Sequence, residues 1–186
     1  MNRHASATLA SVGTAKATSL CTFLETIAPF VTYEPIIDLW TTETADSLLN
    51  GNPDFILDCI DNITTKVDLL AYCHAHGLRV ISSMGSGCKS DPTRAQVGDI
   101  SDTTDDPLSR STRRALRAKG IDKGIQVVFS SEKPPKEGAK LLPLPAEEFA
   151  KGNVGELSSL PNFRVRILPV IGTLPTALQK LCHHEI

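Results

Sequence analysis

The sequence lacks several features that would place a protein in a class at once. No apolar run reaches the roughly 18 residues that a membrane-spanning helix needs, and the first residues hold no apolar signal-peptide core. The five cysteines are odd in number and form no CxxC pair, which argues against a disulfide framework and a four-cysteine zinc site. The net charge of −2 gives no overall attraction to nucleic acid. We therefore expect a globular protein with reduced thiols, in which any RNA contact comes from a local basic patch.

Helical and strand-like patterns alternate along the 186 residues. The helical patterns cover 15–28, 43–49, 64–76 and 107–119. The strand-like patterns cover 30–36, 54–60, 78–84, 95–100 and 124–131, and a last one falls within 164–175. Because helices alternate with apolar strands, we expect an α/β fold with a Rossmann-like, doubly wound and mostly parallel sheet.

The composition changes after residue 131 and suggests a division of the chain. We expect an α/β domain over 1–131, with a basic helix at 107–119. Residues 132–160 are rich in lysine and proline and are interpreted as a loop or insertion. Residues 161–186 should hold a closing strand and a divergent tail.

Polar residues follow the apolar run of 54–60. Asp58 lies near the end of the expected strand, and Asp61 and Asn62 come just after it. Ligands of doubly wound sheets bind beyond the carboxyl ends of the strands, so Asp61 and Asn62 are candidate site residues. The alternative is that Asp61 or Asn62 only caps the next helix, for which Thr64 and Thr65 are also candidates. We interpret Asp58 as structural, because a buried carboxylate needs partners.

Two cations near the N-terminus complete a possible phosphate site. Mg²⁺ is commonly held by one or two carboxylates together with substrate phosphates. Arg3 can grip phosphate oxygens through its planar fork, and Lys16 follows Gly13 in the first turn of a helix, where backbone amides favour anions. The hypothesis is that Arg3, Lys16 and Asp61 surround one magnesium-bound triphosphate.

The motifs together carry a family resemblance. NRH at 2–4, VGTAK at 12–16, DCIDN at 58–62 and SSMGSGCKSDPT at 82–93 resemble the ThiF/MoeB superfamily of adenylating enzymes, which are related to ubiquitin activation. Within it, DPTRAQVGDI, DDPLSRSTRRALRAKGI, VVFSSEKP and RILPVIGTLP resemble the tRNA threonylcarbamoyladenosine dehydratase branch, especially its fungal members. The similarity extends from residue 2 to about 175, and it implies that residues 1–131 form a partial ThiF-type nucleotide-binding domain.

The resemblance implies a reaction and roles for the candidate residues. Members use ATP to activate the carboxylate of the threonylcarbamoyl group on adenosine 37 of tRNA, and the activated group then cyclises. Carried over by motif, Asn2 and Arg3 contact the ATP phosphates and Lys16 neutralises charge at the transferred phosphorus. Asp61 holds Mg²⁺, and Asn62 lines the same site.

The resemblance also implies partners and a location. The substrate is tRNA carrying threonylcarbamoyladenosine, and relatives are often homodimers. Four arginines spaced i, i+3, i+4 and i+7 share one helical face that suits tRNA phosphates, the alternative being a solvated basic face. They are Arg110, Arg113, Arg114 and Arg117. The expected location is cytoplasmic, or the cytosolic face of the mitochondrial outer membrane in a longer product.

The sequence departs from the superfamily at its start. The superfamily opens with a strand and a GxGGVGS-like loop, followed by a second strand with a ribose-binding acidic residue; this sequence has neither. We therefore expect an N-terminally truncated form, possessing little activity by itself. Two alternatives stay open: activation of a ubiquitin-like sulfur-carrier protein, whose enzymes commonly have CxxC pairs, and a non-catalytic interaction module. Cys88 is interpreted as a packed small residue, because no base for a thiol nucleophile is visible.

Overall fold

The computed structural model of the protein describes residues 6–133. The chain divides into two compact units, Met1–Leu39 and Trp40–Ile186. The expectations for Asn2, Arg3, the loop beyond residue 133 and the closing strand lie outside the described residues. In the part that is described, no helix is both long and apolar enough to cross a membrane.

The first unit contains a short 3₁₀ turn, η1 (Leu9–Ser11), and the helix α1 (Lys16–Ile27), which confirms the helix expected over 15–28. The strand expected over 30–36 is wrong: this segment has no strand structure. A strand needs a hydrogen-bonded neighbour, and Pro35 lacks the N–H group that a ladder uses. No strand precedes residue 56 in the described part of the chain.

The second unit is built around a four-stranded mixed sheet with the order β1-β2-β4-β3. Its strands are β1 (Ile56–Asp58), β2 (Val80–Ser83), β3 (Ala95–Asp99) and β4 (Gln126–Ser130). Its helices are α2 (Ala45–Leu49), α3 (Ile63–His76), α4 (Pro107–Ala118) and the 3₁₀ turns η2 (Pro92–Arg94) and η3 (Ile100–Asp102). β1, β2 and β4 are parallel and only β3 runs antiparallel, at one edge. The expected α/β fold with a mostly parallel sheet is thus confirmed.

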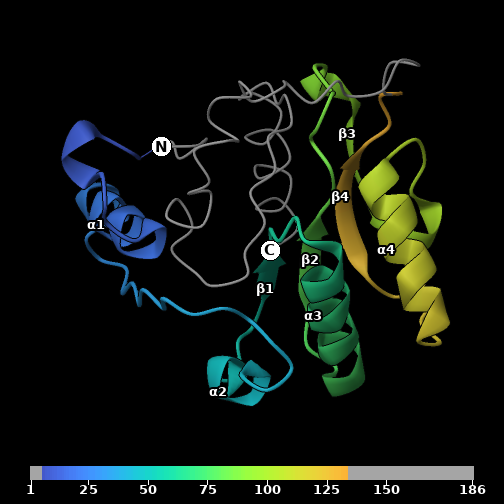
Figure 1. The fold of residues 1–186 in the computed structure, drawn as a ribbon, viewed down its shortest axis with the longest axis horizontal. Coiled ribbons are helices and arrows are strands. Elements are labelled where there is room, and N and C mark those ends of the chain that lie inside the picture. Colours follow the sequence, from blue (N-terminus) through green and yellow to red (C-terminus); the bar gives the residue numbers. More distant parts are fainter. Residues whose placement is uncertain (1–5, 134–186) are drawn as a thin grey trace, which may run out of the picture. The chain divides into compact units, whose positions relative to one another are not determined.

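The main core lies between the sheet and two helices. α3 and α4 lie side by side against one face of the sheet (Figure 1). Leu70 of α3 and Leu116 of α4 pack in one buried cluster with Val127 and Phe129 of β4. Because side chains alternate along a strand, Val128 faces the other side, where it is buried in a second cluster. Both described helices of this core cover the same face, so a doubly wound arrangement stays a prediction.

Helix ends follow from local sequence. Asn62, rather than Thr64 or Thr65, is the N-cap of α3: its side-chain oxygen accepts the Thr65 backbone N–H at 3.2 Å. The expectation of a threonine cap is wrong because Asn62 already supplies the acceptor at the start of the helix. Gly77 ends the helix at φ 64°, as expected for a left-handed cap. Asp106 caps α4 directly before its first residue, a proline, also as expected.

Candidate functional site

The carboxyl ends of three parallel strands meet at one edge of the sheet. β1 ends at Asp58, which pairs with Ser82 of β2; β2 ends at Ser83, which pairs with Val128, and β4 continues to Ser130. The loops that follow are residues 59–62, here called the acidic loop, and residues 84–91, here called the 84–91 loop. Ligands of such sheets bind at this edge.

The acidic loop presents one carboxylate to solvent. Asp61 is exposed, and it makes no hydrogen bond or ion pair with another described residue. Asn62 is also exposed, but its oxygen is engaged in capping α3. The alternative that Asp61 or Asn62 only caps the next helix therefore holds for Asn62. The Asp61 carboxylate has no structural partner within residues 6–133.

Asp58 lies behind the acidic loop in a buried polar network. Its Oδ2 accepts from Lys66 Nζ at 2.5 Å and from the Ser82 hydroxyl at 2.5 Å, while its Oδ1 accepts from the Ile60 backbone N–H at 2.9 Å. Lys66 Nζ also donates to Ser82 Oγ and to the Ser83 carbonyl, both at 3.0 Å. The side chains of both charged residues are fully buried. The expected structural role of Asp58 agrees with this arrangement.

The network explains how two charges tolerate burial. Desolvating an ion pair is costly unless the remaining donors and acceptors are satisfied. Here the three N–H groups of Lys66 meet three acceptors, and Asp58 receives three donors. Removing only one partner of such a pair typically costs about 3–5 kcal/mol, because the other charge stays buried. The pair therefore fixes the end of β1 to α3 and β2.

A second buried ion pair anchors the 84–91 loop. Lys89 Nζ donates to the Ser130 carbonyl at 2.8 Å and lies 3.4 Å from Asp106 Oδ1. The Asp106 carboxylate also accepts the backbone N–H groups of Gly85, at 3.2 Å, and Ser109, at 3.0 Å. One aspartate thus caps α4 and ties the start of the loop to that helix, and Lys89 ties its far end to β4.

Glu132 fastens the end of the same loop from outside. Its carboxylate accepts the backbone N–H groups of Ser90 and Asp91, each at 2.8 Å, and the Ser90 hydroxyl at 3.1 Å. The hydrogen bond from the Asp91 N–H, followed by those from Ser90, lowers the pKa of Glu132. The Thr93 side chain and backbone likewise lower the pKa of Asp91. The 84–91 loop is held at both ends before any ligand binds.

Two thiols of the second unit, one in the acidic loop and one on α3, are protonated at neutral pH because their pKa values are raised. Burial, and then the charge of Asp58, raises the pKa of the Cys59 thiol. Burial raises the pKa of Cys73 to about 11. Cys88 in the 84–91 loop is half-buried with a left-handed φ of 61°, and its interpretation as a packed residue stays a prediction. Neither Cys59 nor Cys73 is a ready thiolate nucleophile.

The remaining predicted phosphate contacts belong to the first unit. Lys16 is the first residue of α1 and is exposed, and it follows Gly13, whose φ is 88°. The N-terminal backbone N–H groups of a helix favour anions, so Lys16 has the local setting expected of it. Asn2 and Arg3 lie outside the described residues, and the convergence of Arg3, Lys16 and Asp61 stays a prediction.

The four arginines on the basic face of α4 differ in their exposure and in their contacts. Arg113 is half-buried, and its Nη1 donates to the carbonyl and the hydroxyl of Thr103, each at 2.6 Å, which holds η3 against the helix. The other three arginines of the face are exposed: Arg110, Arg114 and Arg117. Arg117 forms an exposed ion pair with Asp122 at 3.6 Å. Arg113 therefore has a structural role whether or not the face binds RNA.

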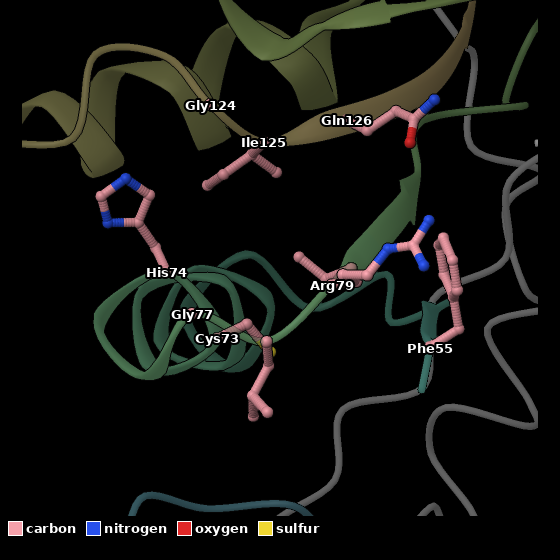
Figure 2. Close-up of a pocket in the computed structure, with 10 residues that line it drawn as sticks. Phe55, Cys73, His74, Gly77, Arg79, Gly124, Ile125 and Gln126 are labelled. Carbon is pink, nitrogen blue, oxygen red and sulfur yellow. The ribbon is translucent and has the colours of Figure 1, made fainter. Parts of the chain in front are cut away.

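A pocket of about 320 Å³ lies at the opposite edge of the sheet. It is lined by the end of α3 and the residues that lead into β2 and β4, as Figure 2 shows. The guanidinium of Arg79 lies 4.0 Å from the centroid of the Phe55 ring, and His74 faces the pocket from α3 (Figure 2). No carboxylate lines it, so it offers no ligand for Mg²⁺. The pocket is at the amino ends of the parallel strands and is separate from the candidate site.

Comparison with known proteins identifies the family of the chain. The model of the ThiF family matches residues 1–184. The chain belongs to the ThiF family.

Curated relatives of this ThiF-family chain share a name. tRNA threonylcarbamoyladenosine dehydratase 2 of Saccharomyces cerevisiae is 55% identical over 178 residues, which are 95% of this chain and 40% of the relative. Dehydratase 1 of the same yeast is 41% identical over 179 residues, again covering 40% of the relative. The Bacillus subtilis dehydratase is 37% identical over 134 residues, 72% of this chain and 53% of the relative. The chain thus spans less than half the length of either yeast protein.

Solved structures support the same fold. Escherichia coli tRNA N6-threonylcarbamoyladenosine dehydratase, TcdA, aligns with a TM-score of 0.64 and 29% identity, over 70% of this chain and 57% of TcdA. A structure of TcdA in complex with ATP aligns with a TM-score of 0.62 and 23% identity, over 93% of this chain and 66% of that one. At that identity the second structure supports the fold alone.

Sequence reasoning missed both buried lysines. Lys66 lies in line with Leu70 and Cys73, at i, i+4 and i+7 on the buried side of α3. A lysine on an apolar helix face was the signal that could have revealed it. Lys89 had no such signal, because it lies in a loop, where no helical or strand periodicity marks a buried side.

Proposed function

We propose that this chain is part of an ATP-dependent tRNA threonylcarbamoyladenosine dehydratase. The observation that carries the proposal is the exposed, unpartnered carboxylate of Asp61 at the carboxyl edge of the sheet in a ThiF-family chain, within the part that the structure describes. The name of the yeast relative with 55% identity supports the choice of reaction.

The reaction has two steps. A carboxylate oxygen of the threonylcarbamoyl group attacks the α-phosphorus of ATP, and pyrophosphate leaves. The acyl-adenylate then cyclises within the modified nucleoside, and AMP leaves, so that water is lost overall. Adenylation is needed because a free carboxylate is a poor electrophile, whereas AMP is a good leaving group.

The residues present fit Mg²⁺ in its nucleotide-bound form. No group of three or more His, Cys, Asp or Glu side chains could hold a metal in the described part of the chain, which does not favour an all-protein metal cage. Mg²⁺ in nucleotide sites instead uses one or two carboxylates with substrate phosphates, and Asp61 supplies one. When bound there, the ion would stabilise charge on the departing pyrophosphate.

The other site residues extend this proposal to the phosphates. Asn2 and Arg3 would contact the triphosphate, and Lys16 would neutralise charge at the transferred phosphorus. The amide nitrogen of Asn62 would face the same site while its oxygen caps α3. This requires the first unit to bring Lys16 to the carboxyl edge of the sheet.

The test is ATP–pyrophosphate exchange by the full-length protein, with Asp61→Asn as the variant. We expect Asp61→Asn to lower exchange by at least the roughly 10–100-fold that loss of an outer-shell partner of a metal ligand typically costs, if the carboxylate holds the metal. Asp54→Asn is the matched control, because Asp54 is also exposed but lies before β1, at the opposite edge. Equal exchange by Asp61→Asn and Asp54→Asn would contradict the assignment.

A second measurement separates this proposal from the activation of a sulfur-carrier protein. Mass spectrometry of tRNA nucleosides from a deletion strain should show uncyclised threonylcarbamoyladenosine accumulating, and unchanged nucleosides would exclude the dehydratase.

The proposal includes tRNA contact by the exposed arginines of α4 and a homodimer with a doubly wound sheet. It also includes a cytoplasmic location, or one on the cytosolic face of the mitochondrial outer membrane in a longer product.

A further inference from the structure

A buried cation lies directly behind the acidic loop. Lys66 is the fourth residue of α3, and its side chain is fully buried. Its ammonium group contacts Asp58 at the end of β1 and both Ser82 and Ser83 at the end of β2. The same side chain thus joins three elements at the edge where the proposed nucleotide would bind.

The two oxygens of Asp58 have different partners. Oδ2 is held by Lys66 and Ser82, which belong to the helix and the neighbouring strand. Oδ1 holds the backbone N–H of Ile60, which belongs to the acidic loop and directly precedes Asp61. Lys66 therefore fixes the carboxylate that in turn fixes the backbone next to Asp61.

This arrangement also separates the roles of the two carboxylates. Asp58 is buried, with both oxygens engaged, and its charge is paired with that of Lys66. Asp61 is exposed and has no partner among residues 6–133. A cation in the acidic loop therefore meets one carboxylate that is still open to it, and the direction of that carboxylate depends on the loop backbone.

We propose that the Asp58–Lys66 pair positions Asp61, with Lys66 acting through Asp58 and touching neither metal nor substrate. The inference rests on the proposed function, since it assigns Lys66 as a positioning residue for the Mg²⁺ ligand. Residues that orient a metal ligand through hydrogen bonds typically change metal affinity by about 10–100-fold when replaced.

The test replaces the pair without leaving a buried charge. Asp58→Leu with Lys66→Met removes both charges and the acceptor for Ile60, and replacing a buried pair by apolar residues often preserves folding. The matched control is Asp68→Leu with Lys119→Met, because this pair joins α3 to the end of α4 at 3.1 Å and is partly exposed. Asp58→Asn with Lys66→Met is a milder second variant, which keeps an oxygen for the Ile60 N–H.

Two measurements are made on the full-length protein. Hydrogen exchange reports protection of the acidic loop without nucleotide, and ATP–pyrophosphate exchange is followed across a Mg²⁺ series. We expect the Asp58→Leu/Lys66→Met variant to lose loop protection and to need about 10–100-fold more Mg²⁺ for half-maximal exchange. The Asp58→Asn/Lys66→Met variant should shift both quantities less, in the same direction, and the Asp68→Leu/Lys119→Met control should match the wild type.

The outcomes are distinct. The inference is overturned if both variants of the pair keep the loop protection of the wild type. It is also overturned if protection is lost while the Mg²⁺ requirement is unchanged, because the pair would then be only structural. If the wild-type protein shows no exchange at all, the proposed function fails. The positioning claim, which rests on that function, then falls with it, whereas an active wild-type protein leaves the claim to be decided by the variants.

Discussion

Replacing Gly85 by alanine tests how tightly the 84–91 loop is packed against α4. A Cβ at this position would lie 2.7 Å from Asp106 Oδ1 and 3.3 Å from the Cβ of Leu108. The Asp106 carboxylate cannot simply turn away, because it accepts the N–H groups of Gly85 and Ser109 and pairs with Lys89. The backbone of the loop must move instead.

The expected cost follows from this geometry. Inserting a methyl group into a packed site that must shift costs about 1–3 kcal/mol. For a chain of this size, each kcal/mol lowers the unfolding midpoint by about 2–4 °C, so a mid-range cost predicts a fall of about 4–8 °C. The change in free energy should appear in the denaturant midpoint with an unchanged slope.

Thermal and urea unfolding of the variant and the wild type measure this effect. Gly51→Ala is the control: nothing lies within 4 Å of its Cβ position and its φ is not positive, so it should be neutral or stabilise by up to about 1 kcal/mol. If Gly85→Ala is as stable as Gly51→Ala, the loop is not held as described.

Three further predictions address the cap, the loop clamp and the basic face. Asn62→Ala should lower the free energy of unfolding by about 1 kcal/mol in urea titrations, because the first turn of α3 loses its acceptor. The pKa values of Glu132 and Asp91 are lowered in the fold, so their stabilisation is present above their ordinary values of 4.5 and 3.8 and is lost as pH falls through the lowered pKa values. Glu132→Gln should flatten this acid dependence of the unfolding midpoint. Arg110→Glu with Arg114→Glu should weaken tRNA binding by the full-length protein and reduce the slope of log affinity against log salt by about 1 per lost contact, whereas an unchanged slope would refute the tRNA face.

Local sequence signals predicted the elements of this fold well. The Pro107 start and Asp106 cap of α4, and the glycine end of α3 at Gly77, depend on neighbouring residues only, and each was found where expected. The strand predicted over 30–36 was wrong because strand formation depends on a distant hydrogen-bonded partner, which periodicity does not reveal. The antiparallel direction of β3 likewise depends on pairing with β4.

The candidate site was predictable only in part for the same reason. The exposure of Asp61 and its place after β1 follow from a short motif. Lys66 bonds to Ser82, which lies 16 residues along the chain, and Lys89 to Ser130, which lies 41 residues along. Such pairings bring together segments that no local pattern connects: the apolar helix face could mark Lys66 as buried, but the partners of both lysines became visible only in the folded chain.

The Lys89–Asp106 pair allows a direct measurement of how much such a connection contributes. Lys89→Met should destabilise the chain by about 3–5 kcal/mol, because Asp106 stays buried with an uncompensated charge. Adding Asp106→Asn removes that charge, so the double variant should be more stable than the sum of the single changes predicts, with a coupling of about 0.5–3 kcal/mol. The exposed Arg117–Asp122 pair, replaced in the same way, should couple by less than about 1 kcal/mol. Additive costs at Lys89 and Asp106 in urea unfolding would mean that the 3.4 Å pair does not hold the loop, and that the hydrogen bond from Lys89 to Ser130 acts alone.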